Sequence, residues 1–192
     1  MIVAVLLFVA GNRISNSVQP PAKAAALSKP EKISEEVKPE KVRYELPRRI
    51  KIPKIKVDAA VEHVGLTPHG EIGVPKGPEN VSWFDNGPRP GEEGSSIIAG
   101  HFGWVNNTPA VFDNLNKLRE GDSIQIEDEK GAIITFVVRK SRTYGSKDTA
   151  MDVFRSNDGK AHLALITCQG TWNKTQKSYS NRLVIFADKI AS

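Results

Sequence analysis

The sequence predicts a mainly β protein with one folded domain of about eight strands and one clear helix. Two observations lead to this fold class. Short apolar or alternating runs recur between residues 49 and 187, separated by glycine, proline or polar turns, and this pattern is typical of β-rich domains. The 192 residues are enough for one globular domain and a tail, but not for two sizeable domains.

The first 48 residues differ in character from the rest of the chain. Residues 2–10 are all apolar, yet a membrane-spanning helix needs about 20 such residues. We interpret residues 1–10 as a partial N-terminal membrane anchor or signal segment, with a buried strand as the other reading. Residues 11–48 contain several prolines and few large apolar side chains, which indicates a flexible basic linker. The folded domain is expected to span residues 49–192.

The net charge of +5 belongs to the N-terminal part of the chain. Residues 1–58 carry 12 Lys+Arg and 6 Asp+Glu, whereas the remaining residues carry 15 and 16. The domain has no stripe of basic residues interleaved with aromatic ones, so no nucleic-acid partner is expected. A basic stalk suits an anionic membrane or cell-wall polymer. The histidines and carboxylates have no metal-ligand spacing, and we expect neither a metal nor another cofactor.

The domain opens with strands and tight turns. Isoleucine and valine alternate with lysine in residues 49–57, which indicates a half-exposed strand with Pro53 at an edge or a bulge. Residues 60–64 are expected to form a second short strand. Residues 95–101 read as a buried strand that ends at His101. The glycines beside this histidine would let a substrate backbone approach closely.

The clear helix is expected to begin at Thr108, because threonine followed by Pro109 is a common start for a helix. Gly121 would end it. Its apolar residues fall on one helical face: Val111, Phe112, Leu115 and Leu118. Residues 123–127 and 132–143 then alternate as two strands around a turn at residues 128–131, which predicts a hairpin.

The C-terminal third contains the last two strands. A polar connection over residues 143–160 is expected to include a short helix around residues 149–155. Residues 163–168 form an apolar run and predict a buried strand. A polar loop over residues 169–180 would place Trp172 and Tyr179 along one side of a groove. The final strand is expected over residues 182–187.

Three reactive side chains stand at the ends of predicted strands. Cys168 is the only cysteine in the chain, and a lone cysteine is more often a small buried apolar residue than a nucleophile. His101 ends one strand and Arg182 opens another. Cysteine with a histidine elsewhere in the chain is a candidate nucleophile arrangement if the fold brings the two together.

The residues around these positions resemble the sortases, cysteine transpeptidases that attach proteins to Gram-positive cell walls. Residues 165–168 match the Leu-x-Thr-Cys signature of this family, residues 99–101 match its histidine motif, and residues 182–185 match its arginine strand. Residue 164 is alanine where the family usually has threonine. The resemblance covers residues 50–190. The Ile-Pro-Lys-Ile opening at residues 52–55, the turn at residues 64–67 and the Gly-Pro-Arg-Pro-Gly loop at residues 87–91 are most similar to class F.

The resemblance implies a fold and a mechanism. The fold would be a closed, mostly antiparallel eight-stranded β-barrel with one or two short helices. Cys168 would attack an LPxTG-type sorting signal between Thr and Gly and form a thioester. His101 would transfer protons, and Arg182 would stabilise the oxyanion or anchor substrate carbonyls. Thr167 would be a further substrate or oxyanion contact.

The resemblance also implies partners and a location. The substrates would be secreted proteins with a C-terminal LPxTG-type signal, and the acceptor an amine of a cell-wall precursor or a protein lysine. The enzyme is expected to be a monomer held at the cell membrane by its N-terminus, with the catalytic domain outside the cell. The alternative is a non-catalytic, membrane-tethered β-barrel that binds wall polymer or a partner protein, with Cys168 buried and inert.

Overall fold

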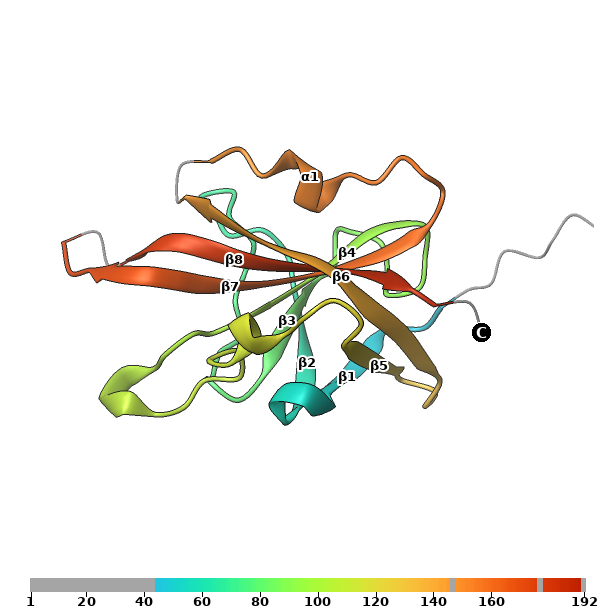
Figure 1. The fold of residues 1–192 in the computed structure, drawn as a ribbon, viewed down its shortest axis with the longest axis horizontal. Coiled ribbons are helices and arrows are strands. Elements are labelled where there is room, and N and C mark those ends of the chain that lie inside the picture. The colour runs from blue at the N-terminus through green and yellow to red at the C-terminus, as the bar shows by residue number, and fades with distance from the viewer. Residues whose placement is uncertain (1–43, 146–147, 176–177, 191–192) are drawn as a thin grey trace, which may run out of the picture. The chain divides into compact units, whose positions relative to one another are not determined.

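Eight strands close into a barrel in the structure, a computed structural model that describes residues 44–145, 148–175 and 178–190 (Figure 1). The predicted anchor and most of the predicted linker lie outside these residues. No helix within the described ranges has the length and apolar character needed to cross a membrane. The strands are β1 (Pro47–Ile52), β2 (Val57–Val64), β3 (Val81–Phe84), β4 (Gly94–Gly100), β5 (Ser123–Asp128), β6 (Ile133–Gly145), β7 (Ala161–Asn173) and β8 (Ser178–Lys189).

The barrel joins its strands in the order β1-β2-β3-β4-β7-β8-β6-β5, and β5 pairs back to β1. Only β2–β3 and β4–β7 are parallel pairs, so the expected closed and mostly antiparallel barrel of eight strands is confirmed. The hairpin of β5 and β6 is also confirmed, with Ile126 opposite Ile134. Because β7 lies between β4 and β8, the strand that carries Cys168 has as neighbours the strand that leads to His101 and the strand that carries Arg182.

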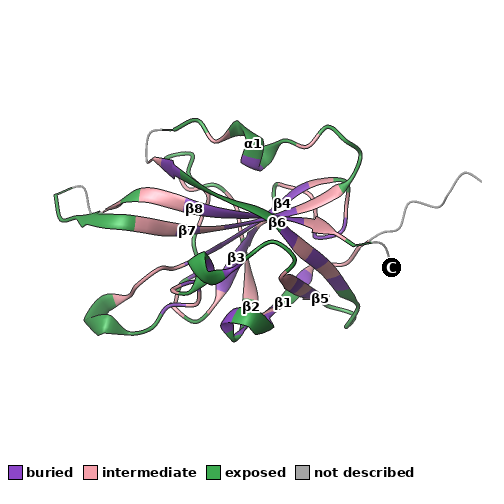
Figure 2. Ribbon diagram, in the orientation of Figure 1, coloured by how far each residue is buried: buried purple, intermediate pink, exposed green. Residues whose placement is uncertain are grey.

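Strand β7 shows how the sequence sorts side chains between the two faces of the barrel wall. Leu163 and Leu165 belong to the main apolar core inside the barrel, whereas Ala164 belongs to a second apolar cluster on the outer face. Figure 2 shows that the strands are buried near the centre of the barrel and that the tip of the β7–β8 hairpin is exposed. Successive side chains of a strand point to opposite faces. Ile166 and Cys168 therefore share the outer face with Ala164, and Thr167 faces inward.

The first strand begins earlier than the sequence indicated. It starts at Pro47, two residues inside the segment interpreted as linker, and ends at Ile52. Pro53 then opens a short 3-10 turn over Pro53–Ile55, and Lys56 closes it in the left-handed region with φ of 56°. The expectation of one strand over residues 49–57 with Pro53 at an edge or a bulge is therefore wrong, because the strand stops at Ile52 and a turn begins at Pro53.

The helix predicted from Thr108 to Gly121 is wrong. This segment consists of turns and one 3-10 segment, η3 (Leu115–Lys117), and another 3-10 segment, η2 (Val105–Asn107), directly precedes it. Its backbone bonds run from residue i to residue i−3, as from Leu115 N–H to the Phe112 carbonyl at 3.1 Å. The apolar side chains still enter the core, where Phe112 and Leu115 are fully buried. The spacing of the apolar residues thus predicted correctly which side chains are buried, but it did not predict the backbone conformation. A 3-10 turn also places residues three apart on one side.

The short helix expected around residues 149–155 is confirmed as α1 (Met151–Phe154). It lies in the connection between β6 and β7, over the outer face of the barrel (Figure 1). Val153 packs into the outer apolar cluster. The buried Tyr144 hydroxyl on β6 donates to both oxygens of Asp152 at 2.8 Å. Burial, followed by this carboxylate, raises the pKa of Tyr144 to about 12.

The polar loop predicted over residues 169–180 is instead mostly a continuation of the hairpin. Strands β7 and β8 run on past the barrel wall, with Trp172 opposite Tyr179. A shift in register between Gln169 and Trp172, beside Gly170 with φ of 90°, bends the extension. A bulge of this kind tolerates polar residues that are not typical of a strand, which is why the composition suggested a loop.

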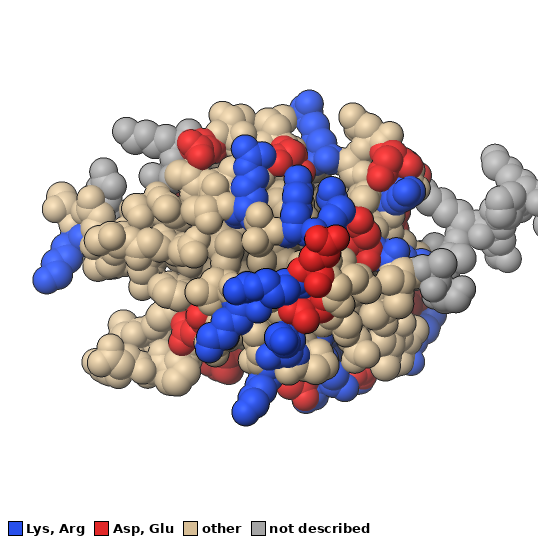
Figure 3. Space-filling view, viewed as in Figure 1, with Lys and Arg blue, Asp and Glu red and all other residues tan. Residues whose placement is uncertain are grey.

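Charged side chains of both signs interleave on the face of the barrel seen in Figure 3. On β6, Arg139 pairs with Asp188 at 3.1 Å, and Arg142 pairs with Asp152 at 3.1 Å. Exposed pairs of this kind contribute at most about 1 kcal/mol each. Their main effect is to fix neighbouring elements, in this case β8 and α1, against β6.

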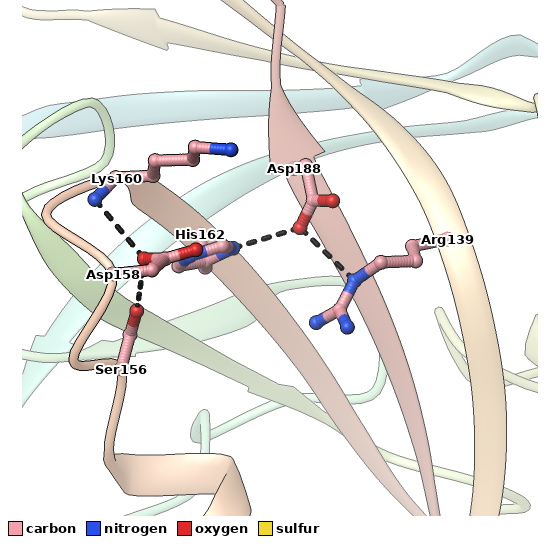
Figure 4. Close-up of polar contacts among 6 residues, drawn as sticks. All are labelled: Arg139, Ser156, Asp158, Lys160, His162 and Asp188. Carbon is pink, nitrogen blue, oxygen red and sulfur yellow. Dashed lines mark hydrogen bonds and ion pairs between the residues drawn. The ribbon is translucent and has the colours of Figure 1, made fainter.

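A histidine at the start of β7 forms hydrogen bonds with an aspartate of the β6–β7 connection and with an aspartate of β8 (Figure 4). His162 Nε2 lies 2.9 Å from Asp158 Oδ1, and His162 Nδ1 lies 2.7 Å from Asp188 Oδ1. Asp158 also accepts hydrogen bonds from the Ser156 hydroxyl and the Lys160 backbone N–H. These donors, His162 first, hold the pKa of Asp158 well below its ordinary value of 3.8.

Replacement of this carboxylate is expected to destabilise the protein in a pH-dependent way. A lowered pKa means that the folded state binds the proton more weakly than the unfolded state, so the stabilisation is present above the ordinary pKa and is lost as the pH falls below it. Asp158→Asn should therefore lower the urea midpoint at pH 7, and the difference from wild type should shrink below about pH 4. Glu120→Gln, at an exposed carboxylate, is the control. If the urea midpoint of Asp158→Asn stayed equally far below that of wild type at low pH, the loss of stability would come from packing and not from the charge.

Candidate active site

A cleft of about 920 Å³ opens beside the end of β7. One wall is the connection that follows β4, and the other is the β7–β8 hairpin extension. Cys168, His101 and Arg182 all line this cleft. The three candidate residues, separated by up to 81 positions in the sequence, are therefore brought to a single opening.

Cys168 occupies the outer face of β7 and is half-buried. It is directly opposite Arg182 on β8. Burial raises the pKa of the Cys168 thiol above its ordinary value, and the positive charge of Arg182 acts in the opposite direction. The thiol is consequently mostly protonated at neutral pH, and the thiolate is the reactive form. The alternative reading required a buried cysteine, whereas Cys168 is only half-buried and lines the cleft.

The rate of alkylation of Cys168 by iodoacetamide should report this raised pKa. The rate is expected to keep rising as the pH passes 9, since the thiolate is the species that reacts. Arg182→Gln should move the midpoint to higher pH, because it removes the charge that lowers the pKa. Chain unfolded in urea provides the reference for an unperturbed thiol. A midpoint below that of the unfolded chain would contradict the prediction.

Arg182 is held at the start of the buried part of β8. Its Nη1 donates to the carbonyl oxygens of Tyr179 at 3.1 Å and Asn181 at 3.0 Å. Within the described residues, Arg182 forms no ion pair with a carboxylate. A guanidinium has five N–H donors, so a fixed Nη1 leaves the rest of the group able to bind an oxygen in the cleft.

His101 follows β4 directly. Its Nε2 lies 2.8 Å from the Pro75 carbonyl oxygen, and its ring packs against Trp104 at 4.6 Å between ring centroids. A carbonyl oxygen only accepts hydrogen bonds, so Nε2 carries a proton. Nδ1 is then the hydrogen-bond acceptor of the neutral ring. No hydrogen bond joins His101 to Cys168, so the two do not form a resting pair.

Thr167 does not lie in the cleft. Its side chain is 3% exposed, and its hydroxyl donates to the Gly100 carbonyl at 2.8 Å. The sequence predicted that this side chain contacts the substrate, but it does not line the cleft and its hydroxyl is bonded to Gly100 instead. Thr167 instead ties β7 to the end of β4, and so fixes the strand that carries the cysteine relative to the strand that precedes His101.

Gly100 also has a different role from the one expected. A Cβ at this position would lie 2.5 Å from Phe112 Cδ2 and 2.8 Å from Val111 Cγ1. The space that glycine leaves is thus filled by core side chains, not by a substrate backbone. Phe112 N–H in turn donates to the His101 carbonyl at 3.1 Å. The close packing fixes the backbone of His101 in place.

The remaining wall of the cleft combines aromatic rings with one acid. Trp172 and Tyr179 line it, as expected, with their ring centroids 5.1 Å apart. Sequence reasoning did not identify Phe102, Trp104 or Asp113 as part of the site. The only signal in the sequence was their position within 12 residues of His101. The helix prediction explained the apolar residues of that segment as core packing and gave no role to the others.

Comparisons with known proteins point to one family. Residues 50–190 match the Sortase domain family model. The fold is similar to that of sortase C1 from Streptococcus agalactiae, with 22% identity over 76% of this chain and 67% of that one and a TM-score of 0.59. Sortase A from Corynebacterium diphtheriae, in a lid mutant, is 24% identical over 80% of this chain and 75% of that one, with a TM-score of 0.59.

A Clostridium perfringens sortase D5 transpeptidase is 27% identical over 76% of this chain and 79% of that one, with a TM-score of 0.56. No curated protein sequence matches the chain. The family model spans nearly the whole described barrel, and the structural neighbours are sortases of classes A, C and D. The chain belongs to the sortase family of cysteine transpeptidases.

Proposed function

We propose that this sortase cleaves an LPxTG-type sorting signal between Thr and Gly and transfers the acyl group to an amine. The observation that carries the proposal is that one cleft is lined by Cys168, His101 and Arg182. These residues supply a nucleophile, a proton carrier and a fixed positive charge, which are the three groups that acyl transfer through a thioester requires.

In the first step the Cys168 thiolate attacks the carbonyl carbon of the Thr–Gly bond. The oxygen gains negative charge, and Arg182 stabilises it with its guanidinium. As the C–N bond breaks, protonated His101 gives the proton on Nδ1 to the leaving glycine amine. The products are a thioester on Cys168, a released fragment with a free amine, and neutral His101.

In the second step an incoming amine attacks the thioester carbon. His101 Nδ1 takes a proton from the attacking nitrogen, the C–S bond breaks, and sulfur leaves as the thiolate. Active enzyme needs the thiolate and protonated His101 at once. The raised pKa of Cys168 means that only part of the enzyme has this combination at neutral pH.

The outer apolar cluster is a suitable surface for the leucine and proline of the signal. Ile166 faces the same side of β7 as Cys168, two residues before it. Three further apolar residues around it are partly buried and pack against the cluster: Ile72, Phe84 and Ala150. A peptide that lies along this surface would bring its Thr–Gly bond to Cys168, and the burial of its leucine would contribute about 1.5–3 kcal/mol.

The finer assignment of the enzyme rests on the sequence. Residues 52–55, 64–67 and 87–91 support class F. Residues 1–10 would anchor the enzyme in the cell membrane, residues 11–48 would act as a linker, and residues 49–192 would face the cell wall as a monomeric catalytic domain. The acceptor would be an amine of a cell-wall precursor or a lysine of another protein.

A fluorogenic LPxTG-type peptide tests the proposal. Incubation with glycinamide should release the C-terminal fragment and give a peptide joined to glycinamide, which mass spectrometry identifies. The Cys168→Ala enzyme provides the background. A library of peptides with changes at each signal position would follow. If no peptide of the LPxT type is cleaved while a different signal is, the substrate assignment is wrong.

A further inference from the structure

The cleft contains a negative charge that the proposed mechanism does not use. Asp113 is the only acidic side chain among the described residues that line the cleft. Its Oδ1 accepts the Gly103 N–H at 2.7 Å, and its Oδ2 accepts the Ala110 N–H at 2.9 Å. Each carboxylate oxygen accepts two hydrogen bonds, so both have capacity left for a donor in the cleft.

A row of aromatic rings crosses the same cleft. Phe102 packs edge-to-face on Tyr179 with centroids 5.5 Å apart, and Tyr179 packs in the same manner on Trp172 at 5.1 Å. The row links the connection after β4 to the β7–β8 hairpin extension. Trp172 is 47% exposed. The faces of tryptophan and tyrosine rings attract cations.

We propose that Asp113 and this aromatic row select a positively charged acceptor amine, an inference that rests on the proposed transfer reaction. The α-amino group of glycine and the side chain of lysine are both mainly ammonium ions at neutral pH. Arg182 lies in the cleft and repels such an ion. Asp113 offsets that repulsion, and the rings provide surfaces over which the ammonium can approach the thioester without full hydration.

The protons of the transfer reaction balance without a proton on Asp113, which agrees with a role for Asp113 in binding the charged acceptor. The ammonium first loses one proton to solvent and becomes the nucleophile. As the C–N bond to the acyl carbon forms and the C–S bond breaks, the nitrogen loses a second proton to His101 Nδ1, and sulfur leaves as the thiolate. Asp113 takes no proton in this sequence. It is a specificity residue for the charged form of the acceptor.

The separation of the two substrate surfaces gives further support. The apolar surface at Ile166 has the character needed for leucine and proline, whereas an aspartate would be an unfavourable neighbour for them. The cleft has the opposite character, with two charged groups and polarisable rings. An acceptor that enters from the cleft therefore reaches the thioester from a side that the acyl peptide does not occupy.

The test is a competition between acceptors for one acyl-enzyme. Glycinamide is mainly cationic at neutral pH, whereas hydroxylamine is uncharged. The measured quantity is the ratio of the two transfer rates at low acceptor concentration. Asp113→Asn is expected to lower the ratio about fivefold, the factor that corresponds to loss of one charge contact of about 1 kcal/mol. Raised salt should lower the ratio in wild type but not in this variant.

Asp122→Asn is the matched control. Asp122 lies in the same connection and also accepts a backbone N–H, from Arg119 at 2.8 Å, but it does not line the cleft. Its removal is expected to leave the ratio unchanged. Because both acceptors attack the same intermediate, any loss of folded enzyme cancels from the ratio. An unchanged ratio in Asp113→Asn, with both rates reduced equally, would overturn the proposal and leave Asp113 as a residue that holds the loop.

A second measurement separates this proposal from the proposed function. If wild-type enzyme transfers to neither acceptor, the transpeptidation assignment fails, and the charge preference is then read from modification of Cys168. A cationic and a neutral methanethiosulfonate are compared, and Asp113→Asn should lower the cationic-to-neutral rate ratio by about threefold or more. The same ratio in wild type and variant would overturn the preference for cations.

Discussion

Replacement of Cys168 by serine is expected to lower amine transfer about 10⁴-fold, although the two side chains differ by one atom. A serine hydroxyl needs an adjacent base to become a nucleophile. His101 does not supply one in the resting enzyme, because no hydrogen bond joins its ring to position 168. Cysteine avoids this requirement because a fraction of the thiol ionises without help.

Transfer of a labelled LPxTG-type peptide to glycinamide, followed by mass spectrometry over hours, measures the loss. Circular dichroism and the urea midpoint should match those of wild type, because position 168 is at the edge of the core. Cys168→Ala defines the background. If the serine enzyme kept more than about 1% of the wild-type rate, His101 would have to move to the nucleophile during the reaction, and the open resting arrangement would not describe the active state.

Most strands were predictable because an alternating or continuously apolar run ends at a recognisable turn. The hairpin of residues 123–143 follows from alternation, and the buried strand that leads to Cys168 follows from a short apolar run. Closure into a barrel was not predictable in this way, because alternation says which side of a strand is buried but not which strand is its neighbour. The family resemblance supplied the closed barrel, whereas the parallel pairing of β4 with β7, between residues almost 70 positions apart, is known only from the structure.

Some residues of the candidate site were likewise predictable from the sequence, and others were not. Cys168, His101 and Arg182 were predicted because reactive residues at strand ends stand out against an apolar run. Thr167 was assigned to the substrate only because it is adjacent to the cysteine, although adjacent residues of a strand face opposite sides. Asp113 was not identified because it lies in the segment that was wrongly predicted to be a helix. Its carboxylate holds the 3-10 turns through Gly103 and Ala110, and no local pattern reports hydrogen bonds across a loop.

Arg182→Ala is expected to lower kcat/KM for peptide cleavage by about 10²- to 10³-fold, the range for removal of one oxyanion donor. Two effects combine. The charge that stabilises the developing oxyanion is lost, and the Cys168 pKa rises further because Arg182 is the group that lowers it. Steady-state cleavage of the fluorogenic peptide measures the loss of oxyanion stabilisation and the rise in the Cys168 pKa together. Alkylation of the thiol by iodoacetamide measures the rise in the pKa alone.

Arg182→Lys separates the two effects. Lysine keeps the positive charge, so the alkylation profile should return toward that of wild type. It lacks the planar set of donors that Nη1 anchors on Tyr179 and Asn181, so cleavage should stay at least about tenfold low. Arg49→Ala, at an exposed arginine of β1 outside the cleft, controls for loss of charge. If Arg182→Lys recovered alkylation and cleavage together, the arginine would act only through the thiol, and the oxyanion would have to be stabilised by another group.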